Sequence, residues 1–170
     1  MPISQRPNGC RVLVHDRDHF VFTLDRFFAM VWRRETRIDA VKRVNRIITD
    51  FAASLAPQRF CLLTLVEAGA PMPPAGSRAG LAHLLHANAE FLVASAVAYE
   101  GSGFRAAAVR GVATSIAVMS NHQFPHRVFS SVFEATDFLT TELSRELGGR
   151  VDGRKMLDSL HNLRTGTPKS

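Results

Sequence analysis

The sequence predicts an α/β fold with a single mixed sheet covered by about four helices. Short apolar segments alternate with amphipathic segments from about residue 27 to about residue 147, with turn-forming residues at nearly every junction. The first apolar segments are joined by short polar turns, whereas helical patterns separate the later ones. Strands joined by tight turns pair antiparallel, and strands joined by a helix return in parallel. We therefore expect antiparallel N-terminal strands followed by parallel β-α-β units.

Two or three strands are predicted at the start of the domain. Residues 11–15 and 20–24 have β-branched and aromatic character, and the polar residues 16–18 separate them. Residues 27–33 alternate in polarity behind a tight connection at 24–26. An antiparallel meander therefore opens the fold.

The clearest helix of the sequence comes next. Thr36 and Asp39 resemble a capping box, and Pro57 is expected to end the helix. Apolar residues recur at helical spacing between them: Val41, Val44, Ile48, Phe51 and Leu55. Residues 60–66, FCLLTLV, then form a continuous apolar run, which is typical of a strand covered on both faces. We expect this strand to be central in the sheet.

A second helix and a third are predicted on either side of the next strand. A Gly/Pro-rich loop, residues 68–76, leads to a helix for which Ser77 is the expected N-cap. Residues 91–99 form the next strand, and a helix rich in alanine then runs from about residue 104 to 119. Because its small side chains permit close approach to the sheet, we expect it to be the most buried helix.

The last elements are a short strand, residues 126–129, and a helix that ends at Gly148. Ser131 and Glu134 form a second capping box before this helix. In the basic segment beyond it, four apolar residues lie at helical spacing, so a short amphipathic helix docks either on the body or on a partner. These residues are Met156, Leu157, Leu160 and Leu163. The predicted organisation is a tail of residues 1–9, a domain of residues 10–147 and a basic extension of residues 148–170.

Length and composition limit the class of protein. The chain has 170 residues, of which 46% are hydrophobic, which suits one domain with one sizeable core. Its apolar runs are too short or too interrupted to span a bilayer, and its N-terminus has no apolar segment typical of a signal peptide. Only two cysteines occur, and Cys61 lies inside an apolar strand. We therefore expect a reduced, cytoplasmic protein.

The formal net charge of +6 raises the question of a nucleic-acid partner. Arginines are spread along the chain, and the densest basic group, within residues 33–46, has Trp32 beside it. It lacks the series of exposed aromatic residues on which bases would stack. A solvated helix face is favoured over a nucleic-acid site.

Residues 101–106 match the pattern G-x-G-x-x-A found at dinucleotide-binding turns. The pattern comes late in the chain, and the next strand does not end in an acidic residue. A tight turn followed by close helix packing is favoured. There is also no G-x-S-x-G motif and no paired-carboxylate motif, so no catalytic residue and no cofactor is predicted.

Three groups of histidines resemble metal or catalytic sites. They are His83 and His86 with Glu90, then His15 and His19 with Asp16 and Asp18, and finally His122 with His126. A metal site needs three or four ligands that converge from fixed elements, and no recognisable ligand spacing supplies them. We interpret the first two groups as solvated helix and turn residues, and the third as loop residues rather than a catalytic pair.

Four segments carry a resemblance to a known family: MVWRRETRIDAVKRVNRIITDF, FCLLTLVEAG, VASAVAYEGSGFRAAAVRGVATSIAVMS and FPHRVFSSVFEATDFL. In the order of their elements and in their general pattern of apolar and polar residues, they resemble the STAS-like domains, the superfamily of anti-sigma-factor antagonists, especially divergent bacterial members. The resemblance covers roughly residues 10–147 and implies a non-enzymatic module that binds a protein partner. In its best-known members, phosphorylation of a serine at the start of a helix switches the module. The family's Asp-Ser-Ser/Thr-Gly type motif is absent, since residues 67–78 are EAGAPMPPAGSR.

We therefore expect a cytoplasmic regulatory or scaffolding module that acts through contacts with a protein partner, a second copy of the chain being one option. The expected surface is the loop of residues 67–78 with its helix, where Ser77 and Arg78 are candidates for partner binding or modification. A role as N-cap already accounts for Ser77, although phosphate there would interact favourably with the helix dipole.

Two alternatives stay open. A small-molecule or lipid-binding protein of the same fold would have an apolar pocket between sheet and helices. An enzyme of unidentified chemistry would bring polar side chains with perturbed pKa values into one cleft.

Overall fold

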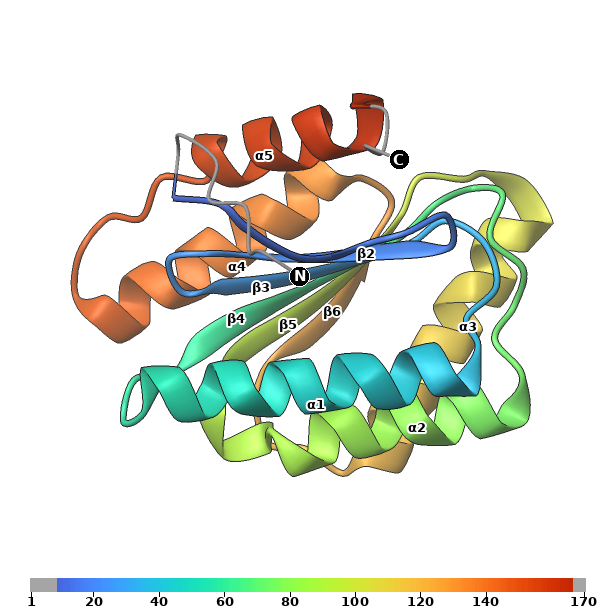
Figure 1. The fold of residues 1–170 in the computed structure, drawn as a ribbon, viewed down its shortest axis with the longest axis horizontal. Helices are drawn as coiled ribbons and strands as arrows, with labels where there is room; N and C mark the ends of the chain where they lie inside the picture. The colour runs from blue at the N-terminus through green and yellow to red at the C-terminus, as the bar shows by residue number, and fades with distance from the viewer. Residues whose placement is uncertain (1–8, 167–170) are drawn as a thin grey trace.

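A six-stranded mixed sheet lies between two layers of helices in the computed structural model, which describes residues 9–166 (Figure 1). The strand order follows the sequence, β1-β2-β3-β4-β5-β6. The first three strands pair antiparallel, and each later strand pairs parallel with the one before it. Their bounds are β1 (Arg11–His15), β2 (His19–Leu24), β3 (Phe27–Trp32), β4 (Phe60–Val66), β5 (Leu92–Tyr99) and β6 (His126–Phe129). The predicted fold class is confirmed.

The helices divide between the two faces of the sheet (Figure 1). The three crossover helices pack on one face, as right-handed connections between sequentially ordered parallel strands require. These are α1 (Ile38–Leu55), α2 (Ala75–Ala87) and α3 (Gly103–Ser120), and a 3-10 turn η1 (Ala89–Phe91) follows α2. The opposite face carries α4 (Val132–Leu147) and α5 (Arg154–Thr165).

Local side-chain hydrogen bonds fix the turn of the N-terminal hairpin. The Asp16 carboxylate accepts hydrogen bonds from the backbone N–H groups of Asp18 and His19, each at 2.9 Å. An aspartate that bonds its own following backbone favours a turn over a continued strand. Asp25, in the connection between β2 and β3, has a φ of 50°, a conformation that aspartate tolerates better than most residues. The predicted meander is confirmed.

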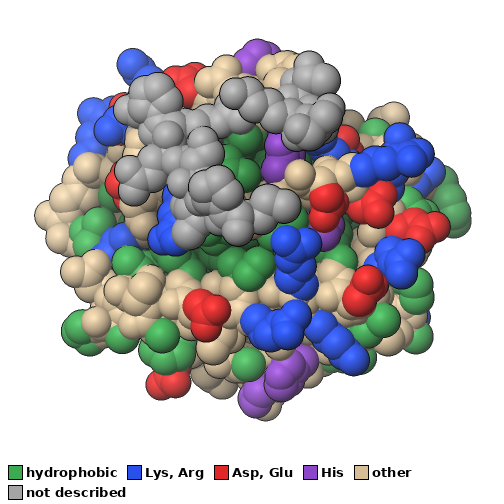
Figure 2. All heavy atoms as spheres, viewed as in Figure 1, with side chains coloured by type: hydrophobic (Ala, Val, Ile, Leu, Met, Phe, Trp, Pro, Cys, Tyr) green, Lys and Arg blue, Asp and Glu red, His purple; other side chains and the backbone are tan. Residues whose placement is uncertain are grey.

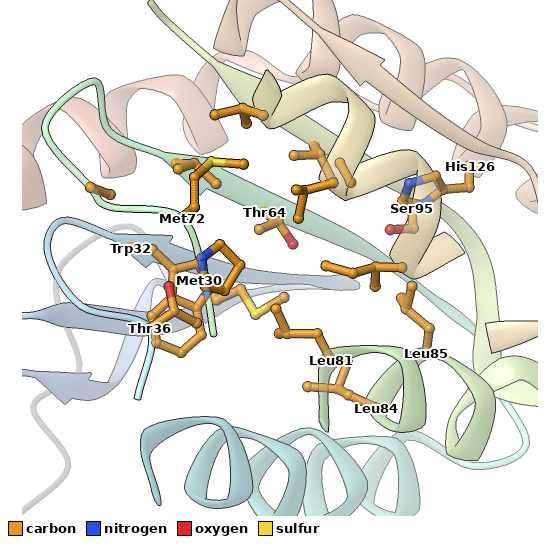
Figure 3. A pocket seen from close by; sticks show the side chains of 18 of the residues that line it. Met30, Trp32, Thr36, Thr64, Met72, Leu81, Leu84, Leu85, Ser95 and His126 are labelled. Carbon is orange, nitrogen blue, oxygen red and sulfur yellow. The ribbon is translucent and has the colours of Figure 1, made fainter. Parts of the chain in front are cut away.

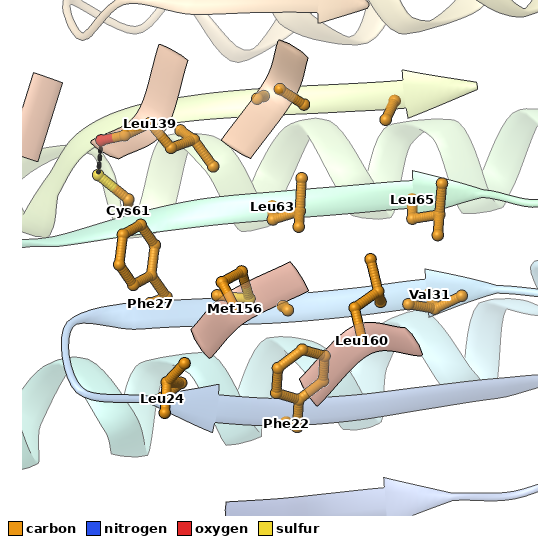
Figure 4. Close-up of a cluster of buried hydrophobic side chains, with 14 of the residues drawn as sticks. Phe22, Leu24, Phe27, Val31, Cys61, Leu63, Leu65, Leu139, Met156 and Leu160 are labelled. Carbon is orange, nitrogen blue, oxygen red and sulfur yellow. Dashed lines mark hydrogen bonds between the residues drawn. The ribbon is translucent and has the colours of Figure 1, made fainter. Parts of the chain in front are cut away.

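Both faces of β4 are buried, because its alternate side chains enter two separate cores. Phe60 and Leu62 pack toward α1 and α2, whereas Cys61, Leu63 and Leu65 pack toward α4 and α5 (Figure 4). The Cys61 thiol donates a weak hydrogen bond to the Leu139 carbonyl oxygen at 3.6 Å. Burial raises the pKa of Cys61 to about 12, so this residue is a packed thiol.

The C-terminal helix α5 docks on the body of the protein. Its residues Met156, Leu160 and Leu163 are at most 2% exposed and belong to the same core as β2 and β3. Figure 4 shows Met156 and Leu160 over these strands. Arg164, near its end, contacts Glu100 at 2.8 Å and Glu67 at 3.3 Å, which lie just beyond β5 and β4. Part of the segment predicted as an extension therefore completes the core. The predicted tail falls largely on residues 1–8, which lie outside the described residues, as do residues 167–170.

Two of the three predicted helix caps are wrong. Arg37 is the N-cap of α1, and Thr36 is buried. Pro74 precedes α2, whose first helical bond runs from the Arg78 N–H to the Pro74 carbonyl oxygen. Ser77 therefore lies inside the first turn, because the helix starts directly after the Pro73-Pro74 pair.

The third predicted cap is confirmed. The Ser131 hydroxyl accepts a hydrogen bond from the Glu134 N–H at 3.1 Å. Gly148 ends α4 with a φ of 65°, as predicted for a helix stop.

The prediction that α3 is the most buried helix is also wrong. Phe104 is 91% exposed and Val118 is 75% exposed. Helices α4 and α5 each bury a larger share of their residues than α3 does. Small side chains allow a helix to approach a sheet, but here α3 faces the sheet across a cavity.

Candidate functional site

An apolar cavity of about 70 Å³ lies between the sheet and helices α2 and α3, and we call it the α2/α3 cavity (Figure 3). The loop between β4 and α2 forms part of its wall. Among the described residues that line it, none is Asp, Glu, Lys or Arg. The principal lining residues are Met30 and Trp32 of β3, Thr64 of β4, Ser95 and Val97 of β5, Leu81, Leu84 and Leu85 of α2, Val109, Ala113 and Ile116 of α3, and His126 of β6.

The strands create this cavity because the side chains on one face change size along their length. In β4 the inward positions Phe60 and Leu62 fill the space next to α1 and α2, and the next position on that face is Thr64. In β5 the side chain beside Leu62 on the same face is Ser95, its register partner, and Val97 is the register partner of Thr64. On the facing helix α3, Ala113 lines the same space. Thr64, Ser95 and Ala113 are smaller than Leu, Ile or Phe, so this part of the core is left unfilled.

Polar atoms without partners collect at this cavity. Within residues 9–166, Ser95 Oγ, Trp32 Nε1 and both ring nitrogens of His126 are buried and form no hydrogen bond. Ser95 and Trp32 are each 1% exposed. Native proteins pair the great majority of such groups, with protein or with ordered water. The arrangement is therefore typical of a site that receives a polar group from a ligand or from water.

Figure 3 shows where these groups stand. Ser95 and His126 lie next to each other, as register partners on the adjacent strands β5 and β6. We call this the Ser95–His126 end. Trp32 and Thr36 lie at the opposite end, and the Thr64 hydroxyl stands between the two. An elongated molecule with a polar group facing the Ser95–His126 end would satisfy the larger group of unpartnered atoms.

His126 is uncharged at neutral pH. Burial, with a smaller contribution from His122, lowers the pKa of His126 to about 4. The two imidazole rings are 5.5 Å apart, and His122 also stacks on Phe124 and forms a hydrogen bond with the Ser120 hydroxyl. A neutral imidazole has one donor and one acceptor nitrogen. The predicted strand of residues 126–129 is confirmed as β6, and His126 begins this strand and lines the cavity, so its interpretation as a loop residue is wrong.

The loop before α2 closes one side of the cavity through Ala70, Pro71, Met72 and Pro73. The Arg105 guanidinium donates a hydrogen bond to the Ala70 carbonyl oxygen at 2.6 Å, which ties this loop to the first turn of α3. Met72 is 36% exposed, so this wall is thin and faces solvent.

The glycine pattern at residues 101–106 has a packing explanation. A Cβ atom at Gly101 would collide with the ring of Tyr99, so any other residue there would require this buried ring to move. Gly103 begins α3 with a φ of 67°. The interpretation as a tight turn agrees with this geometry, whereas the expected close packing of the helix on the sheet is not found, because nothing lies within 4 Å of a Cβ placed at Gly103 and the cavity separates α3 from the sheet.

The candidate residues Ser77 and Arg78 do not line this cavity. Ser77 is buried at 1% exposure in the first turn of α2, and Arg78 is partly exposed beside it. Sequence reasoning missed Ser95, Thr64 and His126. The available indication was weak, namely small polar residues inside otherwise apolar strands.

The other histidine groups separate in space or serve packing. His83 is exposed, and His86 Nδ1 lies 3.0 Å from the Ser120 carbonyl oxygen. His19 is buried against Trp32, with ring centroids 5.0 Å apart, and its Nδ1 lies 3.1 Å from Asp16. In the part of the chain that the structure describes, no three His, Cys, Asp or Glu residues are grouped to hold a metal ion.

The basic residues form no continuous patch on the face shown in Figure 2, where acidic side chains are interspersed among them. Trp32 is buried and cannot stack on a base. None of the helices within residues 9–166 is long and apolar enough to cross a membrane. Comparisons with protein-family models, with curated proteins and with solved structures gave no match.

Proposed function

We propose that this protein binds a small, mainly apolar molecule in the α2/α3 cavity. The observation that supports this most is that buried, unpartnered polar groups of Trp32, Ser95 and His126 line the two ends of an otherwise apolar space. Ligand sites commonly combine an apolar lining with a few polar groups that orient the ligand. The open alternative of a small-molecule or lipid-binding protein is thus the one that this geometry favours.

The size of the cavity limits the ligand. An engineered cavity of about 150 Å³ holds benzene, and the α2/α3 cavity is about 70 Å³. A fully enclosed ligand is therefore smaller than benzene, and a longer one would extend past Met72 toward solvent. Each non-hydrogen atom of a very small ligand contributes at most about 1.5 kcal/mol of binding free energy. A ligand of four or five such atoms therefore binds with a Kd no lower than roughly micromolar, and up to millimolar when the atoms contribute less.

Trp32 provides a direct test. It is the only tryptophan of the chain, so its indole N–H gives a single resonance at the end of the cavity. Titration with 1-butanol should shift this resonance in a saturable way. Ala113→Leu should abolish the shift because the larger side chain fills the cavity.

The matched control is Ala107→Leu, a residue on the exposed side of the same helix. It should bind 1-butanol as the unmodified protein does. A shift that stays linear with concentration, or one that Ala113→Leu leaves unchanged, would contradict binding in this cavity.

A regulatory or scaffolding role through a protein partner, which the STAS-like resemblance implies, stays a prediction. Phosphorylation of Ser77 would require the first turn of α2 to open, since the side chain is 1% exposed. Arg78 has access to solvent and is the better candidate for a partner contact. Arg78→Glu should abolish capture of a partner without unfolding the domain, and retained capture would exclude this surface.

A further inference from the structure

The polar groups at the Ser95–His126 end determine which ligand chemistry the cavity accepts. A serine hydroxyl offers one donor and accepts hydrogen bonds, and a neutral imidazole offers one donor and one acceptor. Both side chains are without partners within residues 9–166, and they are neighbours on β5 and β6. A ligand group that both donates and accepts can satisfy them together, and a hydroxyl is the smallest such group.

A charged ligand group has no counter-ion here. Residues Asp, Glu, Lys and Arg are absent from the described lining. The His122 ring lies 5.5 Å from the His126 ring, and burial also lowers the pKa of His122. An ionised carboxylate or ammonium would therefore lose its hydration without gaining a partner of opposite charge.

A purely apolar ligand fits the lining but leaves the polar end unsatisfied. Such a ligand also displaces any water that pairs with Ser95 and His126 in the empty cavity. Each hydrogen bond to a ligand changes affinity by roughly two- to tenfold, so a hydroxyl is expected to bind about tenfold more tightly than an isostere without it.

We infer that Ser95 and His126 are specificity-determining residues. They select an uncharged ligand whose hydroxyl group lies at the Ser95–His126 end over apolar and ionised analogues. The inference rests on the proposed function, because it concerns the chemistry of the same cavity. It commits the protein to short-chain alcohols, or to the hydroxyl end of a longer neutral molecule.

The test compares three probes of one chain length: 1-butanol, 1-chlorobutane and butyrate. Each is titrated at about pH 7.5 while the Trp32 indole resonance is followed. We expect 1-butanol to bind about tenfold more tightly than 1-chlorobutane. Butyrate should bind at least about tenfold more weakly than 1-butanol, because its charge would be unpaired. Equal binding of 1-butanol and 1-chlorobutane, or stronger binding of butyrate, would overturn the inference.

Two variants test whether Ser95 and His126 cause the preference for a ligand with a hydroxyl group. Ser95→Ala and His126→Leu should each reduce the preference for 1-butanol over 1-chlorobutane by about three- to tenfold. Ser115→Ala, at an exposed position of α3, should leave it unchanged. Thr64→Val removes the hydroxyl between the two ends and should preserve most of the preference. Loss of the preference in Thr64→Val with retention in Ser95→Ala would overturn the assignment.

The outcomes separate the two proposals. If no probe produces a saturable shift, the proposed function fails. If all three probes bind equally and Ala113→Leu prevents their binding, the cavity is a ligand site but the selectivity inference is wrong. The comparison of the three probes in the unmodified protein tests the selectivity by itself, so a Ser95 or His126 variant that fails to fold does not prevent that test, and Ala113→Leu serves to place the binding in the cavity.

Discussion

His126 carries the clearest electrostatic consequence at the scale of single residues. Its ring nitrogens are buried and unpaired within the described chain, and burial is the larger reason for its low pKa of about 4. The folded protein therefore holds this histidine in its neutral form above about pH 4. In an unfolded chain the ordinary pKa of about 6.5 applies.

This difference predicts that stability falls on acidification. Above about pH 6.5 the imidazole is neutral in both states and contributes no pH dependence. Between about pH 6.5 and pH 4 the unfolded chain binds a proton that the folded chain does not, so the free energy of unfolding decreases as the pH falls. By about pH 4.5 the loss from His126 is about 2 kcal/mol. Urea unfolding at about pH 7.5 and pH 4.5 measures it.

His126→Leu should make the free energy of unfolding depend less on pH. A remaining slope is expected, because burial also lowers the pKa values of His19 and His122. His83→Leu, at an exposed position, serves as the control and should keep the full slope. An unchanged slope in His126→Leu would show that this ring is not held neutral.

At the scale of elements, α5 is the segment whose role the sequence left open. Its apolar residues were predicted to dock on the body or on a partner, and the structure places three of them in the core beside β2 and β3. Leu160 is 2% exposed, whereas Leu157 on the same helix is only partly buried. Leu160→Ala should lower the free energy of unfolding by about 2–4 kcal/mol.

Leu157→Ala is the matched comparison and should lower the free energy of unfolding clearly less than Leu160→Ala does. Deletion of residues 150–170 should lower the stability more than Leu160→Ala does, because the face of the sheet under α5 becomes exposed to water. Denaturant unfolding measures all three chains. A truncated chain with undiminished stability would show that α5 lies outside the core.

The elements were predictable where local chemistry decides them. The apolar run of β4 and the Ser131 cap depend on neighbouring residues, and both predictions hold. The start of α2 is also set locally, by the Pro73-Pro74 pair, and the prediction of Ser77 as its N-cap overlooked that pair. The burial of α3 depends on packing between distant segments, and that prediction failed. The alanines of α3 show only that close approach is permitted.

The candidate site could not be predicted from the sequence, because it too depends on packing between distant segments. The α2/α3 cavity is assembled from β3, β4, β5, β6, two helices and a loop, and its polar end exists only because Ser95 and His126 are register partners. A single serine in an apolar strand does not indicate such a partner. The sequence could therefore suggest an apolar pocket as an alternative but not its residues.

At the scale of the whole molecule, the two faces of the sheet differ in how well they are filled. The face under α4 and α5 is packed by residues such as Leu139 and Leu143, each 1% exposed. The face under α2 and α3 holds the cavity, and α3 exposes Phe104 and Val118 to solvent. Regions with fewer buried apolar contacts open at lower free energy than the global unfolding reaction.

Native-state hydrogen exchange should show this asymmetry. We expect the amides of α3 around Ala113 and Ile116 to exchange through an opening about 1–2 kcal/mol below that of the α4 amides around Leu139. Saturating 1-butanol should raise the protection of α3, because a ligand that binds only the closed form stabilises it by mass action against every opening that releases the ligand. Exchange of both helices through one common opening in the absence of 1-butanol would show that the two layers unfold as a single unit and that the cavity does not weaken its side of the sheet.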